Sequence, residues 1–136
     1  MPARAFVDTN VLVYAFDDAD PAKRDRARSL LADDVPLVIS AQVIGEFYVV
    51  VTRKLPIPLS EAHASAAVDE LLRLPVVPID AELTRAAVST SRAAQVSYWD
   101  ALIIEAAAVA GCDRVLTEDL TAGSTIRSVR VENPFA

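Results

Sequence analysis

Cysteine and histidine are almost missing from this chain of 136 residues, because each occurs only once, as Cys112 and His63. A single cysteine excludes an internal disulfide, so we expect a protein that works in a reducing compartment such as the cytoplasm. The same shortage excludes zinc sites of the usual kind, which are built from clusters of cysteine and histidine. Any metal site in this chain is therefore expected to use oxygen ligands.

Long hydrophobic runs are also missing. Charged residues interrupt the longest apolar stretches, as Glu105 interrupts ALIIEAAAVAG, and none reaches the roughly 18 residues of a transmembrane helix. The first residues, MPARAFVD, lack the apolar region and the cleavage site of a signal peptide. We therefore expect a cytoplasmic protein with no membrane partner.

Positive charge is in deficit, since 19 acidic and 13 basic side chains give a net charge of −6. Proteins that bind nucleic acids usually carry a basic surface. Taken by itself, the net charge therefore argues against a nucleic-acid partner.

What the sequence does contain is an alternation of short β-branched runs with longer helical stretches. Strands are predicted at residues 4–8, 36–39, 76–79, 114–117 and, more weakly, 126–131, and helices at residues 10–16, 20–33, 40–54, 60–73, 80–94 and 97–111. Such alternation implies right-handed crossovers and a parallel sheet with helices on both faces. We expect a single domain over residues 1–136, an α/β fold built as a three-layer α/β/α sandwich with four to five parallel strands.

Four carboxylates fall where this fold would bring them to one edge of the sheet. Asp8 ends the first strand, Asp119 follows the fourth, and Asp100 lies in the first turn of the helix that leads into the fourth. Glu46 lies six residues after Ser40, roughly 9 Å along its helix at about 1.5 Å per residue. Helical side chains lean towards the helix N-terminus, so Glu46 can reach the same crevice, where ligands of open parallel sheets bind.

Each acid also has an ordinary structural interpretation. Asp8 is a common turn residue, Asp100 fits a capping box with Ser97, and Asp119 can cap a short turn. Glu46 is the hardest to explain in this way, because its neighbours in VIGEFYVVV belong in a core. These interpretations do not predict that the four acids converge.

Converging carboxylates repel one another and need cations to stay ionised. An all-oxygen ligand set suits Mg²⁺ or Mn²⁺, which in many nucleases and phosphatases act on phosphoryl groups. Setting the four acids aside leaves 15 acidic against 13 basic side chains, so the remaining surface is nearly balanced. Eleven of the basic side chains are arginine, which suits bidentate contacts to phosphate, although a solvated charged face remains the simpler role for most of them.

Four segments of the chain resemble the motifs of one known family. They are FVDTNVL at residues 6–12, QVIGEF at 42–47, SYWDALI at 97–103 and LTEDL at 116–120. Their order and spacing resemble the PIN-domain family, and the SYWDALI and LTEDL forms resemble its VapC ribonuclease toxins of bacterial toxin–antitoxin pairs.

The resemblance implies cleavage of RNA phosphodiesters that depends on one or two Mg²⁺ or Mn²⁺ ions. It assigns Asp8, Glu46, Asp100 and Asp119 to the catalytic, metal-binding quartet, with Asp8 and Asp100 as the most direct ligands. It places Thr9, Asn10 and Thr117 at supporting polar positions, and favours Asp119 over its neighbour Glu118. It also implies a homodimer and a cognate antitoxin protein that blocks the site.

Other functions fit less well. A phosphatase of the haloacid dehalogenase type needs Asp-x-Asp, and Asn10 stands where the second aspartate belongs. A DNA-directed nuclease of the same superfamily shares the acids, but 136 residues leave little room for DNA-gripping insertions. A catalytically silent PIN-like protein that only binds a partner remains a third possibility.

Overall fold

The structure is a computed structural model that describes residues 3–136. Six strands form one sheet in the order β3-β2-β1-β4-β6-β5. The strands are β1 (Arg4–Val7), β2 (Leu37–Ser40), β3 (Val76–Val77), β4 (Cys112–Leu116), β5 (Thr125–Ile126) and β6 (Val129–Glu132). All neighbouring strands run parallel except β5 and β6, which are antiparallel.

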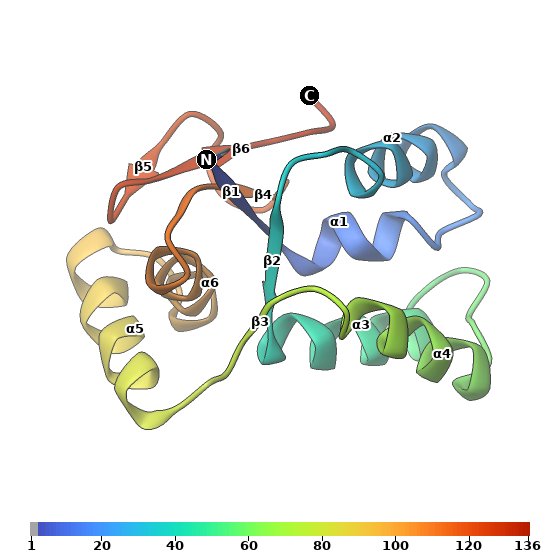
Figure 1. Cartoon of the computed structure of the whole chain (residues 1–136), viewed down its shortest axis with the longest axis horizontal. Coiled ribbons are helices and arrows are strands. Elements are labelled where there is room, and N and C mark those ends of the chain that lie inside the picture. The colour runs from blue at the N-terminus through green and yellow to red at the C-terminus, as the bar shows by residue number, and fades with distance from the viewer. Residues whose placement is uncertain (1–2) are drawn as a thin grey trace.

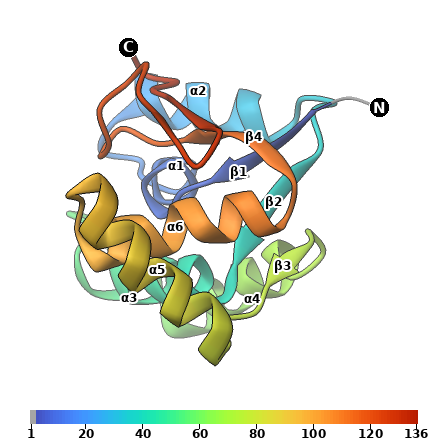
Figure 2. The same ribbon diagram turned by 90° about the vertical axis from the view of Figure 1, so that its left-hand side faces the viewer.

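Helices flank this sheet on both faces, which confirms the predicted α/β/α sandwich. The helices are α1 (Thr9–Tyr14), α2 (Pro21–Leu31), α3 (Ala41–Arg53), α4 (Glu61–Leu71), α5 (Ala81–Ala94) and α6 (Tyr98–Val109). In Figure 1, α5 and α6 lie on one side of the strands and α1 and α2 lie on the other, while α3 and α4 pack beside β2 and β3. Figure 2 shows α5 and α6 crossing each other in front of the sheet.

The polar residue before each helix explains why the helix begins there. In every case its side-chain oxygen accepts a hydrogen bond from a backbone N–H of the first turn, which would otherwise lack a partner. These capping residues are Asp8, Asp20, Ser40, Ser60, Asp80 and Ser97. Because the first turn is held by the residue that ends a strand or loop, each helix start is fixed at a predictable place.

The sheet has six strands where four to five were expected, because the predicted strand at residues 126–131 is a hairpin. β5 and β6 pair around Arg127 and Ser128, whose φ angles are +54° and +62°. A two-residue turn with positive φ at both positions is usually built from Asn-Gly or Asp-Gly. The sequence lacks that signal here, so the turn was not predicted.

The third strand lies at the sheet edge, and it is short. β3 contains only Val76 and Val77 and pairs with β2 alone. Pro75 and Pro78 flank it and cannot donate to a strand ladder, which limits its length.

The core lies on both sides of the central strand β1, between β2 and β4. Fully buried side chains include Phe6 from β1, Ile39 from β2 and Val115 from β4, with Phe47 and Ile104 packed from the helices. Because β1, β2 and β4 are parallel, their carboxyl ends meet at one edge of the sheet. Within residues 3–136, no helix is long and apolar enough to cross a lipid bilayer.

Candidate active site

Asp8 stands at the carboxyl end of β1, where it also caps helix α1. Its side chain is buried, with 6% of the residue exposed. Oδ1 accepts a hydrogen bond of 2.7 Å from the backbone N–H of Thr9, and Oδ2 accepts one of 2.7 Å from Thr117 Oγ1. The carboxylate is therefore held in one orientation by the first residue of α1 and by the residue that follows β4.

Thr117 joins the ends of β1 and β4 through its hydroxyl group. Besides donating to Asp8, Oγ1 accepts hydrogen bonds from the amide of Asn10 at 3.1 Å and from the backbone N–H of Asp119 at 3.1 Å. A hydroxyl has one hydrogen to donate and two lone pairs, so this oxygen is fully used. Its position fixes both Asp8 and the start of the loop that carries Asp119.

Asn10 lies between the two aspartates. Its Nδ2 donates to Asp119 Oδ2 at 3.0 Å and lies 3.4 Å from Asp8 Oδ2, while its Oδ1 accepts from the backbone N–H of Glu118 at 3.3 Å. An amide donor between two carboxylates reduces their repulsion and keeps them near each other. Asn10 thus brings Asp8 and Asp119 to one place.

Glu46 reaches the same edge from helix α3. Its Oε2 accepts a hydrogen bond of 2.8 Å from Thr9 Oγ1, and its Oε1 accepts one of 2.8 Å from Gln42 one turn earlier. The residue is exposed although its helical neighbours Val43 and Phe47 are buried, because its position on α3 faces away from the core. Thr9 therefore connects Glu46 to Asp8, because its hydroxyl donates to Glu46 and its backbone N–H donates to Asp8.

Asp100 is less closely joined to the other three acids. It lies in the first turn of α6, half-buried, and its backbone N–H bonds to Ser97 Oγ at 3.0 Å. Within residues 3–136, no hydrogen bond joins its carboxylate to Asp8, Glu46 or Asp119. Asp100 is connected to Glu46 indirectly, through the residue before it. Gln42 Nε2, which donates to Glu46, also donates to the carbonyl oxygen of Trp99 at 3.4 Å.

Burial changes the acidity of Asp8. Its pKa is raised from 3.8 to about 6, chiefly because burial removes water from the carboxylate. The hydrogen bonds from Thr117 and Thr9 oppose this rise, and the charges of Asp119 and Glu46 add to it. The position therefore favours a positive charge near the carboxylate.

The donor set suits a hard divalent cation, although the acids are not gathered into a preformed cage. In the described part of the chain, no three His, Cys, Asp or Glu side chains lie close enough together to hold a metal ion. Asn10 and Thr117 stand between Asp8 and Asp119, which accounts for part of this separation. The acceptor groups that face the site are nevertheless carboxylate and hydroxyl oxygens, and oxygen ligands are those that Mg²⁺ and Mn²⁺ prefer.

Glu118 has different partners from Asp119. Its carboxylate accepts from Tyr14 OH at 2.5 Å and pairs with Lys23 Nζ at 2.9 Å. The hydrogen bond to Glu118 raises the pKa of Lys23 above its usual value. Glu118 is thus already neutralised by helix α2, which leaves Asp119 as the acid that faces Asp8.

Sequence reasoning overlooked Gln42 and Lys23 as neighbours of the site. Lys23 belongs to the charged stretch AKRDRAR, which was interpreted as a solvated face. Gln42 stands in the QVIGEF motif but carries no charge, and its role depends on a contact with Trp99, 57 residues away. The hydrophobic periodicity of the sequence does not indicate the contact of Gln42 with Trp99 or that of Lys23 with Glu118.

A groove of about 410 Å³ opens beside the acids, between α1 and α3. Thr9, Asn10, Glu46 and Asp119 lie at its polar end. Its apolar lining comes from helices α1 and α3 and the loop after α3, including Val13, Val50 and Leu55. The site therefore adjoins a groove that has both a polar part, next to the acids, and an apolar part.

The model of the PIN domain family matches residues 5–122 of this chain. None of the curated proteins compared with the chain matches it. The matched segment contains Asp8, Glu46, Asp100 and Asp119.

Solved structures with the same fold include several toxins. The chain is 20% identical to VapC20 of Mycobacterium tuberculosis, described as a sarcin–ricin loop cleaving toxin, with a TM-score of 0.64 over 82% of this chain and 86% of that one. A toxin–antitoxin complex from Klebsiella pneumoniae gives 20% identity and a TM-score of 0.69, over 96% and 97% of the two chains. FitAcB of Neisseria gonorrhoeae gives 20% identity and 0.64, over 96% and 98%. The likeness at this identity concerns the fold, while the family match covers most of the chain, and the protein therefore belongs to the PIN domain family.

Proposed function

We propose that this chain is a Mg²⁺- or Mn²⁺-dependent endoribonuclease that acts as the toxin of a type II toxin–antitoxin pair. The observation that carries the proposal is the hydrogen-bonded arrangement of Asp8, Thr117, Asn10 and Asp119 at the carboxyl edge of the sheet, in a chain of the PIN domain family. Glu46 extends that arrangement through Thr9. An array of acids around a buried carboxylate is suited to phosphodiester hydrolysis with a divalent cation.

Asp8 and Asp100 are proposed as the most direct metal ligands, with Glu46 and Asp119 completing the site. A divalent cation bound there would offset the charge of the carboxylates, lower the pKa of a water molecule and balance the charge on the phosphoryl oxygens. The site could take one ion or two. The raised pKa of Asp8 supports this proposal, because a cation would relieve the cost of its buried charge.

The residues of the chain itself orient the reacting groups. Thr117 and the Thr9 N–H hold Asp8, Asn10 holds Asp119 near it, and Gln42 together with Thr9 holds Glu46. Rigidly placed groups are more effective than mobile ones, because little reorganisation is then needed during the reaction. Hydrolysis adds water across the bond between phosphorus and the 3′ oxygen, so the products carry a 5′-phosphate and a 3′-hydroxyl.

The partners in this proposal are an RNA substrate, a cognate antitoxin and a second copy of the chain in a homodimer. Structural neighbours that were solved as toxin–antitoxin complexes support the antitoxin. We also propose that residues 1–136 form a single PIN domain and that the protein acts in the cytoplasm.

The test is cleavage of RNA by the purified full-length protein, with Mg²⁺, with Mn²⁺ and with EDTA. Asp8→Asn and Asp100→Asn should each lower the rate by at least about 100-fold, beyond the 10–100-fold typical for residues that only support a metal ligand. Asp69→Asn is the matched control, because Asp69 is an exposed acid on α4 outside the site. EDTA should abolish cleavage.

Undiminished cleavage by a cleanly purified Asp100→Asn protein would contradict the assignment. DNA of the same sequence, single-stranded and double-stranded, is tested in parallel, and faster cleavage of DNA would favour a DNA-directed nuclease. Absence of turnover on RNA and on DNA would favour a silent partner-binding protein. In cells, RNA ends with a 5′-phosphate should appear at defined positions with the unmodified chain and not with Asp8→Asn.

A further inference from the structure

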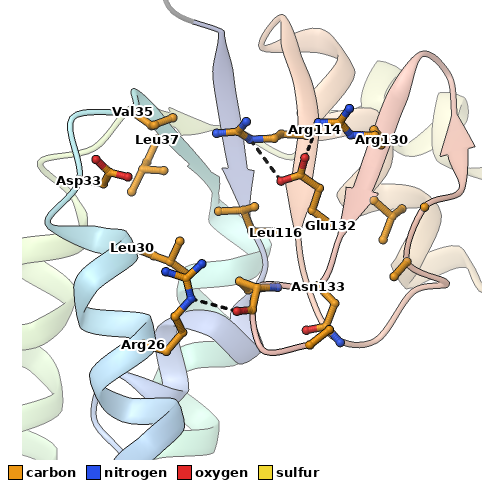
Figure 3. Close-up of a pocket in the computed structure, with 15 residues that line it drawn as sticks. Arg26, Leu30, Asp33, Val35, Leu37, Arg114, Leu116, Arg130, Glu132 and Asn133 are labelled. Atoms are coloured by element: carbon orange, nitrogen blue, oxygen red, sulfur yellow. Dashed lines mark hydrogen bonds and ion pairs between the residues drawn. The ribbon is translucent and has the colours of Figure 1, made fainter.

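A second cavity lies on the opposite side of the sheet from α6. It measures about 560 Å³ and lies between α2 and the strands β4 and β6. Three arginines line it, Arg26 from α2, Arg114 from β4 and Arg130 from β6, and we call it the arginine hollow. Figure 3 shows Arg114 and Arg130 projecting side by side from the two strands, with Arg26 reaching across from the helix.

The register of the sheet places two of these arginines together. Arg114 pairs with Arg130 in the parallel ladder between β4 and β6, and Val115 pairs with Val131. Since successive side chains of a strand face opposite ways, the valines enter the core and the arginines share the other face. Like charges at paired positions repel each other, so the fold alone does not favour this arrangement.

One carboxylate serves both of these guanidinium groups. Glu132 lies 3.7 Å from Arg114, measured from Oε2 to Nε, and also pairs with Arg130. Asp33 and Ala136 also line the hollow, but within residues 3–136 neither forms an ion pair with its arginines. The hollow thus holds more guanidinium groups than paired carboxylates.

The donors of these arginines are also largely unused. The Nε of Arg114 is buried and has no hydrogen-bond partner in the described part of the chain. Arg26 donates from Nε to the carbonyl oxygen of Pro134 at 3.0 Å, an uncharged partner that leaves its charge uncompensated. A buried N–H without an acceptor is costly, so an incoming oxygen ligand would gain by accepting from it.

The arginine hollow adjoins the candidate active site. Arg26 lies about one helical turn after Lys23 on α2, and Lys23 bonds Glu118, the neighbour of Asp119. On the sheet, the Thr117 N–H donates to the carbonyl oxygen of Glu132 at 3.0 Å. Helix α2 and strand β4 therefore each carry or adjoin residues of both the candidate active site and the arginine hollow.

We propose that the arginine hollow binds a phosphodiester group of the RNA backbone at a position away from the cleaved bond. This inference rests on the proposed function for the identity of the polymer. Guanidinium groups match phosphate oxygens in paired hydrogen bonds. Three arginines against the acidic side chains of Asp33 and Glu132 give the hollow a small positive excess within a chain of net charge −6. Phosphate contacts of this kind add affinity and fix orientation without selecting a base.

The test measures binding without cleavage. Full-length protein in EDTA is titrated into a fluorescent single-stranded oligoribonucleotide, and anisotropy gives the Kd at several salt concentrations. The variant Arg114→Gln/Arg130→Gln should bind roughly 5- to 30-fold more weakly, and the slope of log K against log salt should become less steep by about 0.7 for each phosphate that the variant no longer binds. The control Arg85→Gln/Arg92→Gln removes the same charge from α5, on the opposite face of the sheet, and should change the Kd less than about twofold at moderate salt.

Two single variants guard against a folding defect. Arg130 is exposed, so Arg130→Gln should fold normally and weaken binding about threefold, with a flatter salt dependence. Arg130→Lys keeps the charge but loses the planar pair of donors, so it should keep the salt slope and lose only part of the affinity. Thermal unfolding of each variant confirms that binding is compared between folded proteins.

Equal Kd values and equal salt slopes for the hollow variant and the α5 control would overturn the proposal. Tighter, arginine-dependent binding of a labelled glutamate-rich peptide than of the RNA would also overturn it, because the hollow would then serve an acidic protein partner.

The result of this binding test can be distinguished from a failure of the proposed function. RNA binding that depends on these arginines in a protein without nuclease activity would reject only the proposed function. Asp8-dependent cleavage with unchanged binding by the arginine variants would reject only this inference.

Discussion

The hydroxyl group of Thr117 donates a 2.7 Å hydrogen bond to Asp8 Oδ2 across 109 residues of sequence. The bond is possible because β1 and β4 are neighbours and end at the same edge of the sheet. The same hydroxyl accepts from Asn10 and from the backbone of Asp119. Thr117 therefore controls the geometry of both aspartates although it carries no charge.

Thr117→Val tests this role, because it removes the hydroxyl and nearly keeps the shape. The buried Asp8 carboxylate would lose its shortest side-chain donor, so we expect a loss of about 1–3 kcal/mol in the free energy of unfolding at pH 8. RNA cleavage should fall about tenfold or more, as for other residues that orient a ligand. Denaturant unfolding and initial cleavage rates measure the two effects.

Thr117→Ser is the control for that variant, since it keeps the hydroxyl. It should retain most of the stability and most of the rate. If the valine variant matched the wild type in both measurements, the hydroxyl would have no role in holding Asp8.

Stability of the metal-free protein should depend on pH through Asp8. Its pKa is about 6 in the folded protein against 3.8 for an ordinary aspartate, so the folded state holds the proton more tightly. This contribution is fully present below about pH 4 and is lost as the pH rises through about 6, with a total on the order of 3 kcal/mol. Urea unfolding in EDTA between pH 4 and pH 8 measures it.

Asp8→Asn separates this contribution from that of the other acids. The asparagine cannot ionise, so the variant should gain stability relative to the wild type as the pH rises from 4 to 8. If the difference in the free energy of unfolding between the two proteins stayed constant from pH 4 to pH 8, the pKa of Asp8 would not be raised by burial.

Asp119 and Glu118 should differ in their effects on cleavage. Asp119 faces Asn10 and Asp8, whereas Glu118 is paired with Lys23 and Tyr14. We expect Asp119→Asn to lower the rate about 100-fold and Glu118→Gln to lower it less than about tenfold. Single-turnover rates with the same RNA make the comparison, and the reverse order would identify Glu118 as the member of the site.

An ion pair between an exposed arginine and a buried carboxylate holds the β5–β6 hairpin to the helices. Glu105 on α6 is 4% exposed, accepts from Thr90 and pairs with Arg127 at 2.9 Å. Arg127→Gln leaves this carboxylate without a charged partner, so we expect a loss of about 2–3 kcal/mol, somewhat below the value for a fully buried pair because Arg127 is exposed. Thermal or urea unfolding measures the loss.

The double variant Arg127→Gln/Glu105→Gln is the matched comparison. Removing both charges should recover part of the loss, because an unpaired buried charge no longer remains. If the double variant were less stable than Arg127→Gln alone by the full effect of Glu105→Gln, the two residues would not be coupled.

Much of the fold follows from local features of the sequence. Asp20, Ser40 and Asp80 mark helix starts that the structure shows, because capping depends only on residues in the next turn. The prolines beside Val76 and Val77 also act locally, because a proline has no N–H to donate to a neighbouring strand, and this favours the edge position that the structure shows. The β5–β6 turn at Arg127 and Ser128 escaped prediction because its backbone conformation is imposed by the sheet and not by the residue types.

The candidate site was predictable only to the level of topology. The order of strands and helices indicated that Asp8, Asp100 and Asp119 lie at one edge of the sheet and that Glu46 can reach that edge from within its helix. The bonds that determine their relation depend on side-chain placement across distant segments, as with Asn10 and Asp119 or Glu46 and Thr9. The separate position of Asp100, and the pairing of Glu118 with Lys23, could likewise not be derived from spacing.

The placement of β4 beside β1 also has a consequence for the synthesis of the protein. Asp8 is synthesised 109 residues before its partner Thr117, and β6 must still follow to complete the sheet beside β4. A nascent chain therefore cannot bring Asp8 and Asp119 together before β4 has been synthesised. Any activity that needs both aspartates waits for that strand.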